Sequence, residues 1–222
     1  MPGKCDRPAE ALPAVNQSGG REVWLNIMND ECVLHECAVA LLLIDVINDL
    51  EFEEGKALMR AALPAAGNIE QLKQEAKTYG VPCLYVNDNF GQWQSDFKHL
   101  VTRCVQDNVR GAQISQELVP QPDDYFVLKP RHSGFFQTPL DLLLRHLHAT
   151  KLILCGLTTD SCVLFTANDG YLRGYEILVP EDCSAAVSKS RHLGALGQMR
   201  RTVKACTVAS GQIDFEQLLK KK

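Results

Sequence analysis

The amino-acid sequence predicts an α/β fold, a three-layer α-β-α sandwich around a mainly parallel, roughly six-stranded Rossmann-like sheet. Short apolar runs rich in branched residues are typical of strands covered on both faces, and several such runs occur along the chain. They alternate with stretches of helical pattern, which implies right-handed crossovers between parallel strands. With 222 residues, 45% of them hydrophobic, the chain is long enough to bury one sizeable core.

The predicted strands and helices follow one another along the chain. The run VALLLID at residues 39–45 carries the strongest strand signal, and the run at 81–87 has its proline near the start, where a strand tolerates it. Further strands are expected at residues 124–130, 151–157, 175–180 and 203–209. Helical patterns fall between them at residues 56–79, 138–148, 159–172 and 184–199.

Residues 1–37 are predicted to form a partly irregular arm, and residues 38–222 the folded domain. The first twenty residues are rich in Pro, Gly and Ala, and the pattern at residues 22–37 is ambiguous. The N-terminus has neither the apolar core of a signal peptide nor the Arg-rich pattern of a transit peptide. We therefore expect a cytoplasmic protein.

Composition argues against several classes of partner. The 23 basic residues against 27 acidic ones give a formal charge of −4, so no basic field is available to hold nucleic acid or an anionic membrane. No apolar run approaches the roughly 18 residues that a membrane span needs. The nine cysteines are irregularly spaced and include no CxxC pair, which argues against a disulfide framework or a zinc ribbon and for reduced thiols.

Polar side chains follow the predicted strands at the edge of the sheet where open α/β folds bind ligands. Asp45 ends the first strand, Asn87 and Asp88 end the second, Lys129 ends the third, and the fourth leads toward Cys162. Cys162 would lie in the first turn of a helix, where unpaired amides and the helix dipole favour the reactive thiolate.

Each of these residues also has an ordinary explanation. A free cysteine is often a small core residue, a carboxylate can cap a helix or form an ion pair, and a lysine can be a surface residue. Together, however, Asp45, Lys129 and Cys162 could converge on one point. The carboxylate would take the thiol proton, the ammonium would stabilise the anions, and the thiolate would attack an electrophilic carbon.

Three separated motifs resemble, in order, those of the isochorismatase-like cysteine hydrolases. They are ALLLIDVINDLEF, FVLKPRHSGFFQTPL and LILCGLTTDSCVLFTANDGYLRGYEILVPEDCSAA, and the resemblance extends from about residue 39 to the end of the chain. It implies Asp45 as acid and base, Lys129 as its electrostatic partner and Cys162 as nucleophile. It also implies an oxyanion hole formed by the backbone amides of Thr158 and Cys162, and a cis peptide bond between Leu157 and Thr158.

The resemblance implies a function as well. Family members hydrolyse small amides, ureides and related compounds such as nicotinamide, N-carbamoyl compounds and biuret, whereas a minority without the cysteine cleave the vinyl ether of isochorismate. Because Cys162 is present, we expect hydrolysis of a small amide, ureide or carbamoyl substrate through a thioester. The alternatives are vinyl-ether hydrolysis with Asp45 as general acid, or a non-catalytic ligand-binding or redox-responsive protein with Cys162 as an oxidisable thiol. The family's common dimers and tetramers imply a homo-oligomer.

Two departures from the family pattern affect the expected site. Ile47 stands where family members often carry glutamine, so one hydrogen-bonding side chain is missing. The nicotinamidase branch holds a metal with histidines after the second strand, but residues 87–93, NDNFGQW, contain no histidine, and His99 is isolated. We therefore expect no metal and no other cofactor.

The substrate pocket is expected beside the nucleophile, lined in part by aromatic side chains, with simple loop packing as the alternative explanation for them. The predicted pocket residues are Asn48, Asn89, Trp93, Phe135 and Phe136. His132 lies close to Lys129 in the sequence, but a catalytic role for it is not the expectation.

Overall fold

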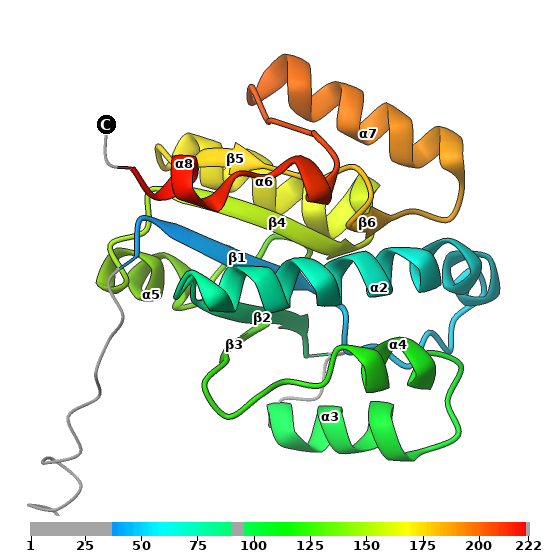
Figure 1. The fold of residues 1–222 in the computed structure, drawn as a ribbon. Helices are drawn as coiled ribbons and strands as arrows, with labels where there is room; N and C mark the ends of the chain where they lie inside the picture. The colour runs from blue at the N-terminus through cyan, green and yellow to red at the C-terminus, as the bar shows by residue number, and fades with distance from the viewer. Residues whose placement is uncertain (1–36, 90–95, 221–222) are drawn as a thin grey trace, which may run out of the picture. The chain divides into compact units, whose positions relative to one another are not determined.

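The computed structural model describes residues 37–89 and 96–220. The predicted N-terminal arm, apart from Cys37, lies outside the described residues. Within them, six strands form one sheet in the order β3-β2-β1-β4-β5, with β6 paired to β4 and every pairing parallel (Figure 1). The strands are β1 (Val39–Ile44), β2 (Cys83–Asp88), β3 (Tyr125–Lys129), β4 (Lys151–Leu157), β5 (Glu176–Leu178) and β6 (Ser184–Ala185). The predicted sheet is confirmed.

Helices connect the strands and cover the sheet. They are α2 (Gly55–Thr78), α3 (Phe97–Gln106), α4 (Ala112–Glu117), α5 (Leu140–His146), α6 (Leu164–Leu172), α7 (Lys189–Thr202) and α8 (Phe215–Leu219). A π-helical turn, η1 (Thr159–Val163), precedes α6, and a 3₁₀ turn, η2 (Ser210–Gln212), precedes α8. None of the helices in the described part of the chain is both long and apolar enough to cross a membrane.

Alternate side chains of the strands pack against different helices. In β1, Leu41 and Leu43 belong to a hydrophobic core that also contains Leu58 of α2, and Figure 1 shows α2 along this face of the sheet. On the opposite face, a Cβ atom added to Gly170 of α6 would lie 3.3 Å from Leu152 Cδ1 of β4. The sheet is thus covered on both faces, as consecutive apolar residues in a strand predict.

The sixth strand lies elsewhere than the sequence predicts. Of residues 203–209, all of which are described, only Cys206 pairs with the sheet, through an isolated bridge to Leu178. Lys204, with a φ of 56°, takes the backbone out of the extended conformation just before this bridge. The sixth strand is instead β6, inside the stretch predicted to begin a helix, where two residues pair with Gly156 and Leu157 of β4.

The helix boundaries differ where side chains cap the ends. The helix predicted from residue 184 begins only at Lys189, because Ser188 caps it by accepting a hydrogen bond from the Arg191 N–H at 3.3 Å. The helices α3 and α4, between β2 and β3, are not predicted by the sequence. Asp96 caps α3 by accepting from the His99 N–H at 2.8 Å.

Candidate active site

Asp45, Lys129 and Cys162 meet at the carboxyl ends of three strands. Asp45 directly follows β1, Lys129 ends β3, and Cys162 lies in η1, which follows β4 after one residue. Lys129 Nζ lies 2.8 Å from Asp45 Oδ2 and 3.5 Å from Cys162 Sγ. The Asp45 carboxylate also acts on Cys162, since it raises the pKa of the thiol. The structure therefore brings together the three side chains that the sequence predicts to converge.

The backbone around Asp45 fixes the direction of its carboxylate. Asp45 has a φ of 51°, and its N–H still donates to the Val86 carbonyl of β2 at 3.0 Å as the chain leaves β1. Its Oδ1 accepts the Asp88 N–H at 2.7 Å, while its Oδ2 pairs with Lys129. Because each oxygen has its own donor, the carboxylate is held in one orientation.

Lys129 is a buried cation and not a surface lysine. Its side chain is 0% exposed, and an isolated ammonium at such a position would be strongly disfavoured. Asp45 compensates its charge at 2.8 Å, and Asp88 Oδ2 lies at 3.6 Å on the partly exposed side of the site. The ordinary explanation that the sequence left open for this lysine is therefore wrong.

Burial is the largest influence on the pKa values of Asp45, Cys162 and Lys129. It raises the pKa of the Asp45 carboxyl, although the Lys129 ammonium opposes this effect. It raises the pKa of the Cys162 thiol to about 12, and the Asp45 carboxylate adds to the increase, which Lys129 only partly offsets. Burial acts against the Lys129 ammonium, but the attraction of Asp45 and then of Cys162 outweighs it and raises the Lys129 pKa. The free protein therefore holds a neutral thiol beside an ammonium–carboxylate pair.

Lys129 lowers the pKa of the Cys162 thiol, as predicted, but burial and then Asp45 outweigh it, so the net shift is away from the predicted thiolate. Cys162 does lie in the first turn after β4, but the sulfur is removed from water, and this penalises its charged form. Moreover, the Lys129 ammonium is already neutralised by Asp45. A thiolate would leave the buried group of three with a net negative charge, which is costly unless a proton stays inside the site.

Two polar links from α7 hold η1, the turn that carries the candidate nucleophile Cys162 and is called the nucleophile turn below. Thr159 Oγ1 lies 2.8 Å from His192 Nδ1, and His192 Nε2 lies 3.0 Å from the Glu181 carbonyl oxygen. Because a carbonyl only accepts, Nε2 carries the proton, and Nδ1 of the neutral ring accepts from the Thr159 hydroxyl. Burial, which lowers the pKa of His192, supports this neutral form. Beside this link, Arg191 Nε donates to Asp160 Oδ2 at 2.6 Å.

Sequence reasoning missed these α7 residues. They follow the nucleophile turn by about thirty positions, and no local motif marks Arg191 or His192 as parts of a site. Arg191 also lies 3.2 Å from Glu54 Oε1 at the start of α2, so it ties three segments together. Only the packing of α7 on η1 reveals this role.

His132 lies closer to Cys162 than the sequence suggests. Its Nδ1 is 3.9 Å from Cys162 Sγ, and its ring contacts the Phe165 ring of α6 with centroids 5.5 Å apart. His132 is exposed. The Cys162 sulfur thus has an exposed imidazole as well as the buried Lys129 ammonium as neighbours.

The two phenylalanines predicted to line the pocket lie in different environments. Phe135 is only 4% exposed; its ring stacks on Tyr175 at 5.9 Å, and the Arg173 guanidinium lies 4.7 Å from its centroid. It is therefore part of the packing beneath α6, and its place in a substrate pocket stays a prediction. Phe136, the next residue, is 45% exposed and remains available to a ligand.

Of the remaining predicted pocket residues, the structure describes Asn48 and Asn89 but not Trp93. Asn48 Oδ1 accepts the Leu50 N–H at 2.9 Å, so the side chain stabilises the turn after β1. Asn89 follows β2, and its N–H donates to the Lys129 carbonyl at 3.1 Å. Trp93 lies outside the described residues. Ile47 is 0% exposed and belongs to the hydrophobic core, so the position that departs from the family pattern serves packing here.

The peptide bond between Leu157 and Thr158 is cis, as the resemblance implies. The Thr158 carbonyl accepts the N–H groups of Ser161 and Val163 at 3.1 and 3.2 Å, which starts the nucleophile turn. The oxyanion hole of the Thr158 and Cys162 amides stays a prediction. Among residues 37–89 and 96–220, no group of three or more His, Cys, Asp or Glu side chains is arranged to hold a metal ion.

Comparison with known proteins gives consistent matches over most of the chain. Residues 39–210 match the family model of the Isochorismatase domain. The isochorismatase family protein YaaI of Bacillus subtilis (strain 168) is 38% identical over 174 residues, which cover 78% of this chain and 95% of YaaI. Among solved structures, the nicotinamidase SaPncA from Staphylococcus aureus has a TM-score of 0.60 and 25% identity, covering 78% of this chain and 99% of its own. N-carbamoylsarcosine amidase from Thermoplasma acidophilum has a TM-score of 0.60 and 26% identity, covering 79% and 98%.

Proposed function

Because the chain belongs to the isochorismatase family of hydrolases, we propose that it hydrolyses a C–N bond of a small non-peptide amide, ureide or carbamoyl compound. One observation carries the proposal. The buried Lys129 ammonium lies 2.8 Å from the Asp45 carboxylate and 3.5 Å from the Cys162 sulfur. A base, an electrostatic partner and a nucleophile thus share one point, which is the requirement for covalent catalysis by a thiol.

The reaction begins with a proton transfer inside the site. With a pKa of about 12, roughly one Cys162 thiol in 10⁵ is ionised at pH 7, too few for an effective nucleophile. As the sulfur attacks the substrate carbonyl, Asp45 takes the thiol proton, so the site gains no net charge. The raised pKa of the Asp45 carboxyl makes it a stronger base than an exposed aspartate.

The later steps return the proton. The carbonyl oxygen becomes an oxyanion, for which the Thr158 and Cys162 amides are the proposed donors. Asp45 protonates the leaving nitrogen, the C–N bond breaks, and a thioester to Cys162 remains. Asp45 then deprotonates a water molecule, whose oxygen adds to the thioester; the C–S bond breaks, the acid leaves, and Asp45 returns its proton to the sulfur.

The substrate class rests on the relatives. A nicotinamidase and an N-carbamoylsarcosine amidase share this fold over most of their length, and both names denote hydrolysis of an amide or carbamoyl nitrogen. Lys129 and Cys162 stand together here, which favours amide hydrolysis over the cleavage of a vinyl ether that would need only an acid. Neither a metal ion nor another cofactor enters the proposed cycle.

Ammonia release from a panel of small amides, ureides and carbamoyl compounds tests the proposal. Cys162→Ala should abolish turnover, and Cys206→Ser, which alters an exposed cysteine, is the matched control. Acid quenching during turnover should trap an acyl group on the peptide that contains Cys162. Ammonia release by Cys162→Ala would overturn the nucleophile assignment. Binding without any product, or cleavage of isochorismate alone, would overturn the reaction class.

Two further proposals concern the state of the protein. We propose that it forms a homo-oligomer, a dimer or a tetramer, which light scattering after size-exclusion chromatography tests; a monomeric mass would contradict it. We also propose a cytoplasmic location, because the cysteines of the described residues are all free thiols. Fractionation of the source cells tests this location.

A further inference from the structure

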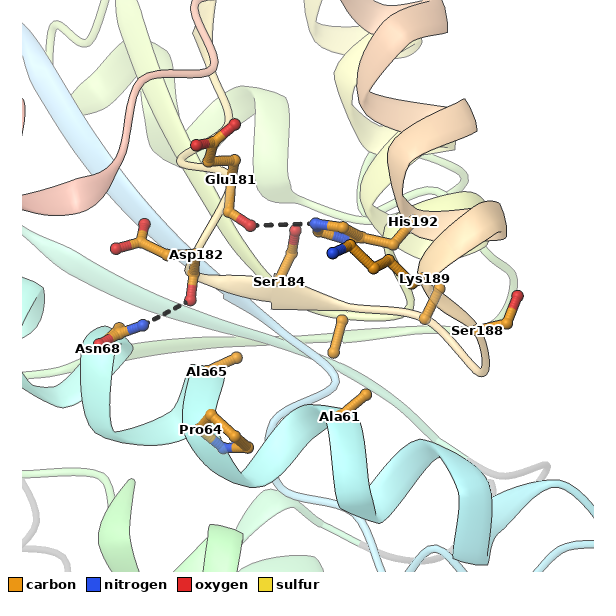
Figure 2. Close-up of a pocket in the computed structure, with 12 residues that line it drawn as sticks. Ala61, Pro64, Ala65, Asn68, Glu181, Asp182, Ser184, Ser188, Lys189 and His192 are labelled. Atoms are coloured by element: carbon orange, nitrogen blue, oxygen red, sulfur yellow. Dashed lines mark hydrogen bonds between the residues drawn. The ribbon is translucent and has the colours of Figure 1, made fainter.

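A pocket lies apart from Asp45, Lys129 and Cys162. It has a volume of about 320 Å³, at the lower end of the range for small-molecule sites, and opens between α2, the segment around β6 and the start of α7 (Figure 2). Its lining residues come from these three segments and include none of the three proposed catalytic side chains. His192 forms part of its wall and also holds Thr159, so the pocket and the nucleophile turn share one side chain.

One side of the pocket is apolar. Small side chains line it from α2 and from the segment around β6, namely Ala61, Pro64, Ala65, Ala185 and Ala186. Such a surface accepts a short aliphatic chain and offers it no hydrogen bond.

The other side of the pocket carries two hydrogen-bond donors, the Ser184 hydroxyl and the Lys189 ammonium. Ser184 is 5% exposed, and its Oγ atom is buried without a hydrogen-bond partner in the described structure. A buried hydroxyl of this kind is costly and calls for a partner. Figure 2 shows the Lys189 side chain extending from α7 toward Ser184. Lys189 is also the first residue of a 14-residue helix, whose N-terminal N–H groups and dipole favour a negative charge.

The acidic residues beside the pocket do not cancel this positive character. The Asp182 carboxylate is turned away and accepts from the N–H and the hydroxyl of Ser210, each at 2.8 Å. The Glu181 carboxylate points away from Ser184 in Figure 2, and only its backbone carbonyl faces His192. The pocket thus offers an ammonium and an unpartnered hydroxyl, although the whole chain has a formal charge of −4.

We propose that this pocket binds a small aliphatic carboxylate. One carboxylate oxygen accepts from the Lys189 ammonium and the other from the Ser184 hydroxyl, while the alkyl part lies against the alanine and proline side chains. A carboxylate fits better than inorganic phosphate, because phosphate would leave the apolar side unused and bring more oxygens than there are donors.

Butyrate is the probe, and its dissociation constant is measured on the full chain by saturation-transfer difference NMR. Lys189→Met should weaken binding by about tenfold or more, because it removes the charged donor. Ser184→Ala should weaken it by about threefold to tenfold, the range for a neutral hydrogen bond. Lys98→Met, an exposed lysine of α3, is the matched control and should bind as the wild type does. Butylamine and inorganic phosphate should not displace butyrate.

The outcomes separate this site from others. Equal affinity in wild type, Lys189→Met and Ser184→Ala would place butyrate elsewhere, the catalytic site included, and overturn the proposal. Displacement by phosphate would show a general anion site and also overturn it. No butyrate binding, together with a changed oligomeric mass of Lys189→Met, would show that a second copy of the chain fills the pocket. Lys189 is exposed, so Lys189→Met keeps the test valid if Ser184→Ala does not fold.

Discussion

Asp45→Asn should make the Cys162 thiol more acidic and yet abolish hydrolysis. In the wild type, burial raises the thiol pKa to about 12, and the Asp45 carboxylate adds to that increase. Asparagine keeps the shape of the side chain but removes its charge, while Lys129 stays 3.5 Å from the sulfur. The ammonium then has the thiolate as its counter-ion, so the charged form of the sulfur is favoured.

The expected size of the effect follows from the charges. Two unit charges about 4 Å apart interact by about 4 kcal/mol at an effective dielectric constant of about 20, which corresponds to about three pKa units. Burial, the larger cause, is unchanged by the substitution. We therefore expect the thiol pKa to fall by about one to three units, and the thiolate fraction near neutral pH to rise about 10- to 1,000-fold.

Alkylation by iodoacetamide across a pH series, followed by mass mapping of the Cys162 peptide, measures this change. The exposed Cys206 in the same digest serves as the internal reference. The variant should alkylate faster than the wild type at neutral pH while releasing no product. Slower or equal alkylation, with the same dependence on pH, would refute the idea that Asp45 keeps the proton on the sulfur.

Three more predictions concern stability and metal. Lys129→Met leaves the buried Asp45 carboxylate unpaired and should lower the free energy of unfolding by about 3–5 kcal/mol in urea titrations. The double variant with Asp45→Asn should recover most of this loss of stability. An unaltered urea midpoint in Lys129→Met alone would contradict the predicted destabilisation. Burial lowers the pKa of His192, so its contribution to stability is complete above the unfolded pKa of about 6.5 and is lost as the pH falls through the folded pKa. Mild acid should therefore lower the melting temperature of the wild type more than that of His192→Gln, and equal losses would argue against a neutral ring. EDTA should leave turnover unchanged, and a loss reversed by zinc or manganese would show that a metal takes part.

The strands that carry the candidate site could be predicted because each is a short apolar run closed by a polar residue. Asp45 and Lys129 could be picked out for this reason. A charged residue directly after a buried strand is costly to bury unless it is paired, so its presence there indicates a specific role. Strand β6 could not be found in this way. Its two residues are held by pairing with β4, and so short a segment has no periodicity.

The properties of the site that depend on packing were beyond the sequence. The position of Cys162 in a first turn suggests a low thiol pKa, but burial and Asp45 reverse the sign. Phe135 and Phe136 are adjacent aromatic residues that the sequence predicts alike to line the pocket. In the structure, Phe135 is 4% exposed and Phe136 is 45% exposed. The links from Arg191 and His192 to the nucleophile turn join segments about thirty residues apart, which no local pattern records.

The ammonium that Asp45 and Cys162 share also bears on how the sulfur withstands oxidation in the free protein. Peroxides and other electrophiles of the cell attack thiolates much faster than thiols. Since Asp45 already balances Lys129, Cys162 stays protonated, and such reagents meet an unreactive sulfur. In the proposed cycle, Asp45 takes the thiol proton only as the sulfur adds to a bound carbonyl carbon. The reactive thiolate would then exist only while a substrate occupies the site.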